Sequence, residues 1–178
     1  KANVLRMSDG LFLECTRAVA AKYPQVECEE QIMDAMAALL VRDATRFDVI
    51  VATNAFGDIL SDEASEISGS LGLAASVNSG DEHALAQAQH GSAPDIAGRG
   101  IADPVGILAS TAMMLRWWGD QRADAALTAC AARIDDAIDV TLATGIRTAD
   151  LGGASTTTEF GAAVVEAIDR GTERADGS

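Results

Sequence analysis

Two aspartates, Asp58 and Asp62, have the side-chain type and the spacing to bind a divalent cation. They lie four positions apart in the stretch NAFGDILSD, so a helix would present both carboxylates on one face. Hard cations such as Mg²⁺ are held by one or two carboxylates together with substrate oxygens and water. The alternative is that both acids cap or solvate the start of a helix, where the helix dipole favours negative charge.

The residues around this pair predict how it is positioned. Residues 47–53 form a short apolar, β-branched run typical of a buried strand, and residues 59–67 have the pattern of a helix. Residues 54–57 would then be a turn from strand to helix. Because ligands of open α/β sheets bind at that edge, we expect both aspartates to face a site.

A longer pattern surrounds the two aspartates: NAFGDILSD at 54–62 is followed by Ser65 and by GSLGL at 69–73. It resembles the signature of the isocitrate/isopropylmalate dehydrogenase family, which are metal-dependent, β-decarboxylating dehydrogenases. The resemblance implies an α/β fold, namely the C-terminal half of a two-domain α/β sandwich enzyme. It also implies NAD-dependent oxidative decarboxylation of a malate-type 2-hydroxy acid. The expected substrate is 3-isopropylmalate, with tartrate, isocitrate and homoisocitrate as alternatives.

The same resemblance implies roles for three residues nearer the start of the chain. Lys1 would be the catalytic lysine that helps to deprotonate the substrate hydroxyl, and Asn3 would approach the nicotinamide across the subunit boundary. Asp34 would act in catalysis and complete the Mg²⁺ or Mn²⁺ site of Asp58 and Asp62 in the partner subunit, so that a homodimer shares its active sites. Without the resemblance, Lys1 is a solvated surface charge and Asp34 belongs to the polar face of a helix.

The segment HGSAPDIAGRGIADP at 90–104 is rich in glycine and proline, which predicts a structured loop. It lacks the GxGxxG fingerprint and resembles instead the adenosine-binding loop of the same family. An acid at position 95 would bond the ribose hydroxyls and repel a 2′-phosphate, which favours NAD over NADP. A loop histidine bonded to backbone is the alternative for position 90. The expected cofactor-binding residues of this loop are His90, Gly91, Ser92, Ala93, Asp95, Ile96 and Asp103.

Two positions near this loop depart from the family pattern. Residues 86–89 read AQAQ where the family usually has an acidic stretch, so a charge near the cofactor is lost. Asp103 stands where the family usually has asparagine. An ionised carboxylate can accept a hydrogen bond from the adenine amino group but, unlike asparagine, cannot donate one.

Composition limits the partners and the compartment. The chain has 178 residues and a net charge of −14, which argues against nucleic acid or an anionic membrane as a partner. Its three scattered cysteines form no disulfide framework, and no signal peptide or membrane-spanning run is visible, so we expect a cytoplasmic protein. The first residue is not methionine, which suggests a fragment or a processed piece.

Hydrophobic periodicity and turn residues predict the remaining elements. Helices are expected at 11–22 after an N-cap at Ser8 or Asp9, at 31–41, from Pro104 to 118, at 120–142, and from a Thr156/Thr157–Glu159 cap to about Gly171. A strand is expected at 26–29, loop and short strand at 69–80, and less regular structure at 81–89.

The resemblance divides the chain into parts of two domains. Residues 1–68 would belong to the small dimer-forming domain that carries the metal aspartates, residues 69–171 to the large cofactor-binding domain, and residues 172–178 to a polar tail. The family's substrate-binding arginines and its proton-donating tyrosine lie upstream, so the chain would need the missing N-terminal half for full activity. The alternative from another class is a non-catalytic subunit or fragment that binds metal and nucleotide.

Overall fold

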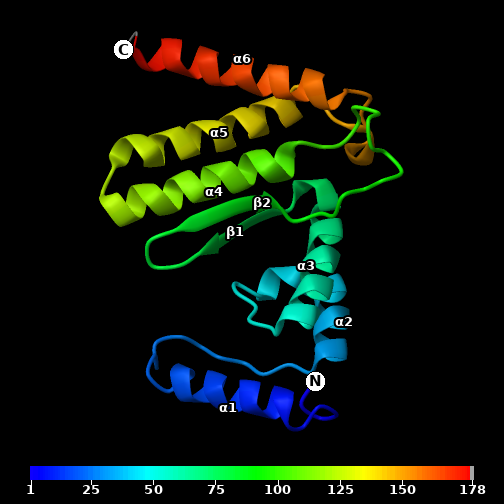
Figure 1. Ribbon diagram of the computed structural model, residues 1–178, viewed down its shortest axis with the longest axis vertical. Coiled ribbons are helices and arrows are strands. Elements are labelled where there is room, and N and C mark those ends of the chain that lie inside the picture. The colour runs from blue at the N-terminus through cyan, green and yellow to red at the C-terminus, as the bar shows by residue number, and fades with distance from the viewer. Residues whose placement is uncertain (177–178) are drawn as a thin grey trace. The chain divides into compact units, whose positions relative to one another are not determined.

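The computed structural model describes residues 1–176, with side chains up to residue 171. The chain divides into two compact units, Lys1–Ile67 and a second that begins at Ser68. Figure 1 labels the helices and strands of both. No helix within residues 1–176 combines the length and the apolar character needed to cross a membrane.

The first unit consists of three helices joined by irregular segments. They are α1 (Ser8–Ala20), α2 (Met33–Asp43) and α3 (Asn54–Ser68), with a 3-10 turn at Ala44–Arg46. Its small core forms where α2 packs on α3, around Met36, Leu40 and Leu60. The prediction of a helix after residue 31 is confirmed, with its start at Met33.

Several predicted details of this unit are wrong. Residues 47–53 and 26–29 form no strand, because the only sheet among the described residues pairs two later segments and leaves them without a partner. The helix of the two aspartates begins at Asn54, so residues 54–57 are its first turn and no connecting turn. Neither Ser8 nor Asp9 caps α1, because both lie inside the helix, which follows Met7.

The second unit is built on a hairpin of β1 (Ala75–Ser79) and β2 (Ala84–Ala88), which follow a 3-10 turn at Leu71–Leu73. The strands are antiparallel and pair Ala75 with Ala88. Fully buried Ser110 ties the hairpin to helix α4, since its hydroxyl accepts from the Ser76 amide at 2.9 Å and donates to the Gln87 carbonyl at 2.7 Å. Residues 84–88 were expected to be less regular, and this cross-strand pairing explains the difference.

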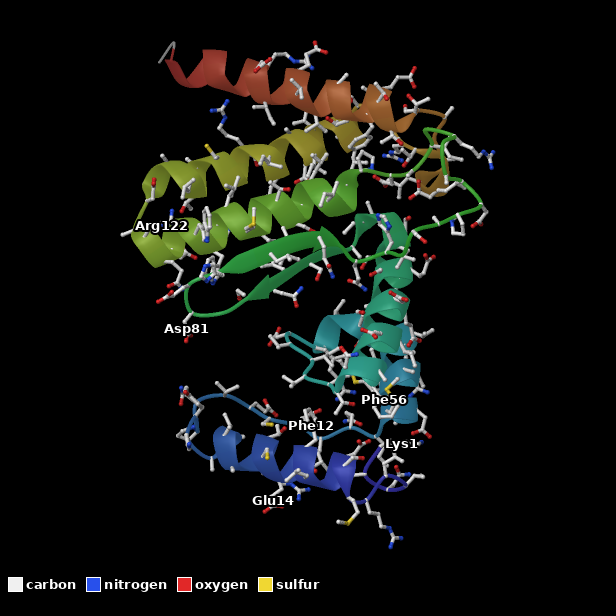
Figure 2. The ribbon with its side chains drawn as sticks, in the orientation of Figure 1. Lys1, Phe12, Glu14, Phe56, Asp81 and Arg122 are labelled. Carbon is white, nitrogen blue, oxygen red and sulfur yellow. The ribbon has the colours of Figure 1, made fainter. Side chains whose placement is uncertain are left out.

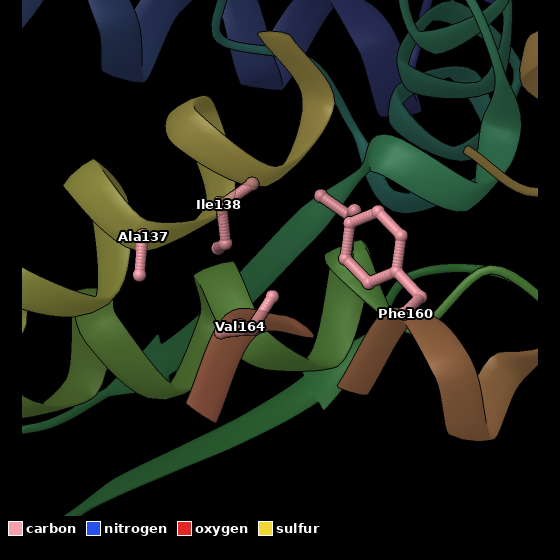
Figure 3. Packing of buried hydrophobic residues seen from close by; sticks show 5 residues of the cluster. Ala137, Ile138, Phe160 and Val164 are labelled. Atoms are coloured by element: carbon pink, nitrogen blue, oxygen red, sulfur yellow. The ribbon is translucent and has the colours of Figure 1, made fainter. Parts of the chain in front are cut away.

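Three long helices stack on that hairpin, as Figure 1 shows: α4 (Val105–Arg122) against the strands, then α5 (Ala125–Ala143), then α6 (Thr157–Asp176). A 3-10 turn at Ala149–Leu151 lies between the last two. The core of this unit is made by buried side chains of α4, α5 and α6 (Figure 3): Val105, Ala137, Ile138, Phe160 and Val164.

The ends of these helices follow local capping chemistry. Pro104 was expected to be the first helical residue of α4, but it is the N-cap, and the helix begins at Val105. The Asp124 carboxylate caps α5 by accepting from the Ala126 amide at 2.9 Å. The predicted Thr156–Glu159 cap of α6 is confirmed: the Thr156 amide donates to Glu159 Oε2 at 2.8 Å, and the Glu159 amide donates to Thr156 Oγ1 at 3.2 Å. The helix runs to Asp176, beyond the end expected near Gly171, and residues 177–178 of the predicted tail lie outside the described residues.

Candidate active site in two parts

The first unit brings Lys1 and Asp34 together. Lys1 Nζ donates to Asp34 Oδ1 at 2.7 Å, although the two residues are 33 positions apart. The Lys1 carbonyl accepts from the amides of Val4 and Leu5, both at 2.9 Å, so the segment before α1 turns back on its start. The bond from Lys1 lowers the pKa of Asp34, which keeps this exposed carboxylate ionised. A lysine beside an anionic carboxylate is a pair that can hold and pass a proton.

Asp58 and Asp62 lie on α3, and both are exposed. Their spacing on one continuous helix places both carboxylates on the same face. Polar side chains of the same helix bond inward instead: Ser65 Oγ donates to the Ser61 carbonyl at 2.7 Å, and Ser65 itself is buried. Asp58 and Asp62 are thus exposed hard oxygen donors, which suit Mg²⁺ or Mn²⁺.

The three predicted metal ligands do not assemble within one copy of the chain. Among the residues that the structure describes, no three His, Cys, Asp or Glu side chains are grouped closely enough to hold a metal ion. Asp34 instead pairs with Lys1, and Asp58 and Asp62 supply only two carboxylates. One or two carboxylates plus substrate oxygens are the usual protein share of a Mg²⁺ site, so the α3 pair alone fits such an ion.

In the second unit, the 90–104 segment is an irregular loop, as predicted. Local turns shape its first part, with the Ile96 amide donating to the Ala93 carbonyl at 3.1 Å. His90 Nδ1 lies 2.9 Å from the Gly91 carbonyl, which only accepts, so Nδ1 carries the hydrogen. Asp95 is exposed, and so are Gly91, Ser92 and Ala93, whereas His90 and Ile96 are half-buried.

The backbone of this loop is held in an unusual conformation. Ala93 has φ +42°, in the left-handed region that residues with a Cβ rarely adopt. Strain of this kind costs about 1–3 kcal/mol and persists where surrounding structure imposes it, often at ligand-binding sites. The exposed amides and the Asp95 carboxylate are thereby presented to solvent on a shaped loop, which suits the hydroxyl-rich end of a nucleotide.

The end of the loop is anchored, unlike its exposed beginning. The Thr157 amide at the start of α6 donates to the Gly100 carbonyl at 2.9 Å, and Thr157 Oγ1 bonds the Ala102 carbonyl. Asp103 is buried, and its Oδ1 accepts from the Val105 amide at 2.8 Å. Asp103 was predicted to contact adenine, but its side chain instead forms a hydrogen bond with the first turn of α4.

Asp103 belongs to a polar cluster that the sequence analysis did not identify. Asp150, on the 3-10 turn before α6, accepts from the hydroxyl of buried Ser70, and buried Thr148 lies beside this turn. Gly72 allows the close approach, because a Cβ there would lie 2.8 Å from Asp103 Cβ and 3.1 Å from Asp150 Oδ2. The only signal in the sequence is the aspartate at 103 in place of asparagine.

Comparison with known proteins covers nearly the whole chain. Residues 1–164 match the sequence pattern of the isocitrate/isopropylmalate dehydrogenase family. An isocitrate/homoisocitrate dehydrogenase from Thermus thermophilus is 49% identical over 168 residues, which are 94% of this chain and 48% of that protein. A 3-isopropylmalate/3-methylmalate dehydrogenase from Methanocaldococcus jannaschii is 43% identical over 168 residues, again 94% and 48%.

Solved structures agree with the sequence matches. The crystal structure of an isocitrate dehydrogenase from Methylococcus capsulatus superimposes with a TM-score of 0.86 at 43% identity, over 94% of this chain and 48% of that one. The predicted mixed α/β fold is thus confirmed as a partial one. The chain spans about half the length of the relatives it matches.

Proposed function

Because the chain belongs to the isocitrate/isopropylmalate dehydrogenase family, we propose that it supplies the metal- and nucleotide-binding half of an NAD-dependent β-decarboxylating dehydrogenase. The reaction is the oxidation of a malate-type 2-hydroxy acid to a keto acid, followed by loss of CO₂. The 2.7 Å bond between Lys1 Nζ and Asp34 Oδ1 supports this proposal most directly, because it joins a proton carrier to an expected metal ligand.

Lys1 is the group that takes the proton of the substrate hydroxyl. An ammonium group cannot accept a proton, so Lys1 must first become neutral. Its ion pair with Asp34 holds Lys1 Nζ 2.7 Å from an expected metal ligand, which positions the base at the site.

Asp58 and Asp62 hold the divalent cation, with Asp34 of a second copy of the chain as the third carboxylate. The described part of one chain brings no such trio together, which is consistent with a set completed by a second copy. Bound Mg²⁺ or Mn²⁺ supplies Lewis acidity, which lowers the pKa of the substrate hydroxyl and stabilises the negative charge left by decarboxylation. Asn3, exposed in the turn beside Lys1, faces the nicotinamide of the same shared site.

The 90–104 loop holds the adenosine end of NAD⁺. Asp95 accepts from the ribose hydroxyls, and its negative charge disfavours a 2′-phosphate. His90 lies against the adenine, and the backbone of residues 91–93 with Ile96 completes the contact. Asp103 supports nucleotide binding indirectly, because its bond from the Val105 amide fixes the end of the loop to α4. A cytoplasmic location stays a prediction.

The substrate is expected to be a malate bearing a carboxymethyl-type or an alkyl group. The names of the relatives slightly favour isocitrate or homoisocitrate, at 49% identity, over the 3-isopropylmalate that the sequence analysis put first, whose dehydrogenases reach 47%. The difference in identity is small, so both substrates belong in the first assay.

The test measures NADH formation by the protein that contains this chain, with each of isocitrate, homoisocitrate, 3-isopropylmalate and tartrate, and with Mg²⁺ or Mn²⁺. One substrate should give NADH and CO₂ in equal amounts, and a chelator should abolish both. Asp58→Asn should lower kcat/KM by about 10³-fold, since a lost metal contact removes several kcal/mol from the transition state. Asp48→Asn removes an exposed charge from the same unit as a matched control.

NADH from none of the four substrates, together with retained binding of Mn²⁺ and NAD⁺ in calorimetry, would favour a non-catalytic binding subunit. Unchanged activity of Asp58→Asn would show that the α3 carboxylates do not hold the ion.

A further inference from the structure

Two carboxyl groups converge on Gly72 in the second unit, where three segments meet. Asp103 ends the 90–104 loop, Gly72 lies in the 3-10 turn before β1, and Asp150 lies in the 3-10 turn before α6. A Cβ built on Gly72 would be 3.4 Å from the Asp103 carboxyl carbon and 3.1 Å from Asp150 Oδ2, so both carboxyls lie on the same side of this residue.

The surroundings of Asp103 do not suit an ionised carboxylate. Asp103 is only 8% exposed, and its Oδ1 accepts a hydrogen bond from the Val105 amide. The other oxygen, Oδ2, is buried and has no hydrogen-bond partner of normal geometry, although the Thr148 hydroxyl lies close enough to both carboxyls to affect their pKa values. A buried charge that is neither paired nor fully hydrogen-bonded is costly, and such groups change protonation instead.

No ion pair among the described residues neutralises the two acids. The ion pairs recorded for the described residues involve neither Asp103 nor Asp150. The 3-10 turn at Leu71–Leu73 carries no charged side chain, and the first turn of α4 carries no acid. At the start of α6 the acid is Glu159, which is occupied by its bonds from Thr156. Asp150 is therefore the charged group that faces Asp103.

We propose that Asp103 and Asp150 hold one proton between them, carried by Asp103, which donates its O–H to Asp150. The proton comes from solvent and reduces the charge of the pair from −2 to −1, so the orphaned oxygen of Asp103 becomes a donor. Asp150 remains ionised and accepts a second bond from Ser70. The shared proton thereby fastens the loop end and the start of α4 to the turn before α6.

The electrostatics of the two acids are consistent with this division. Burial raises the pKa of Asp103, and the nearby negative charge of Asp150 adds to the effect. Burial also acts to raise the pKa of Asp150, but the hydrogen bond from Ser70 and the others that it accepts hold that pKa below its usual range. Because the folded-state pKa of Asp103 is raised, its contribution to stability is complete at low pH and is lost as the pH rises through that pKa.

The direct test is a titration of the ¹³C-labelled aspartate carboxyls of the protein by NMR. The Asp103 carbon, assigned with Asp103→Asn, should bind its proton at least about tenfold more tightly than aspartate in an unfolded peptide. Ser70→Ala should raise the pH of that titration further, because Asp150 loses a bond that favours its ionised form. A titration of Asp103 at or below the normal range, or one unmoved by Ser70→Ala, would overturn the proposal.

A second measurement follows urea unfolding as a function of pH. Asparagine carries a permanent N–H donor, so Asp103→Asn should abolish the loss of stability on raising the pH. Above the raised pKa of Asp103, the equilibrium constant for unfolding of the variant should be lower than that of the wild type, by about tenfold for each unit by which the pKa is raised. The two constants should converge in acid. Asp81→Asn, the same change at the hairpin tip (Figure 2), is the control for loss of one charge. Equal profiles for Asp103→Asn and wild type would contradict a shared proton.

Discussion

The two units differ in how well they cover their own apolar side chains. In the second unit, Phe160 and Val164 are 0% and 2% exposed among the helices α4, α5 and α6. In the first unit the buried cluster is three residues, Met36, Leu40 and Leu60, and large apolar side chains elsewhere face outward, with Met7 89% and Val49 83% exposed. The first unit therefore buries less of its apolar side-chain surface by itself than the second unit does.

This difference teaches that the two units obtain their stability in different ways. The second is held by its own core, its hairpin and its caps, and it carries the expected nucleotide loop. The first carries the expected catalytic lysine and metal carboxylates on helices with a smaller core. Substitutions that act on one unit and spare the other can test this contrast.

The largest effect is expected from the core of the second unit. Phe160→Ala removes a fully buried ring and should lower the free energy of unfolding by about 3–5 kcal/mol, measured by urea titration. Val165→Ala, at a 58% exposed position of the same helix, should change it by no more than about 0.5 kcal/mol. Equal losses from both would mean that α6 is not packed as described.

The next largest effects are expected on ligand binding, with Mn²⁺ binding affected by changes in the first unit and NAD⁺ binding by changes in the second. Asp62→Asn should weaken Mn²⁺ binding by at least about tenfold, or about 1.4 kcal/mol, and leave NAD⁺ binding unchanged. Asp95→Asn should weaken NAD⁺ binding by about tenfold and leave Mn²⁺ binding unchanged, because the charged acceptor of the ribose hydroxyls becomes neutral. Isothermal calorimetry measures both, and a variant that weakens both ligands equally would contradict the separation.

A smaller effect is expected at the cap of α6. Thr156→Ala removes the hydroxyl that accepts from the Glu159 amide and should cost about 1 kcal/mol of stability. Thr156→Ser keeps the hydroxyl and should recover most of the loss. Thermal unfolding of the three proteins compares them, and no difference between alanine and serine would rule out the hydroxyl as the cause.

Acid should weaken the same cap. Hydrogen bonds from the Thr156 amide and hydroxyl lower the pKa of Glu159, so its contribution is present above the unfolded pKa and is lost as the pH falls through the folded one. Glu159→Gln should therefore flatten the acid limb of the stability profile slightly. An acid limb identical to that of the wild type would show that the carboxylate is not what the cap requires.

The smallest effect is expected in the first unit. Val49→Ser, at the 83% exposed position, should change the free energy of unfolding by no more than about 0.5 kcal/mol, although it replaces a large apolar side chain. Urea titration measures this change. A folding loss near that of Phe160→Ala would mean that Val49 is buried by the chain itself.

Much of this molecule was predictable from local signals. Hydrophobic spacing located α2, α4, α5 and α6 to within about five residues at each end, and the Thr156–Glu159 spacing gave the cap of α6. These features depend on residues within one or two turns, whose contacts the sequence states directly. The run at 47–53 looked equally clear, yet it forms no strand, because a strand exists only through hydrogen bonds to a distant partner.

Residue types at fixed spacings were enough to identify the family and the helical periodicity, and they predicted which side chains to expect at a metal and nucleotide site. Tertiary structure alone decided which groups meet. It paired Lys1 with Asp34 across 33 positions and Ser70 with Asp150 across 80, and it buried Asp103 where an exposed contact was expected. Burial and pairing of this kind arise from long-range packing, whose partners no local pattern names.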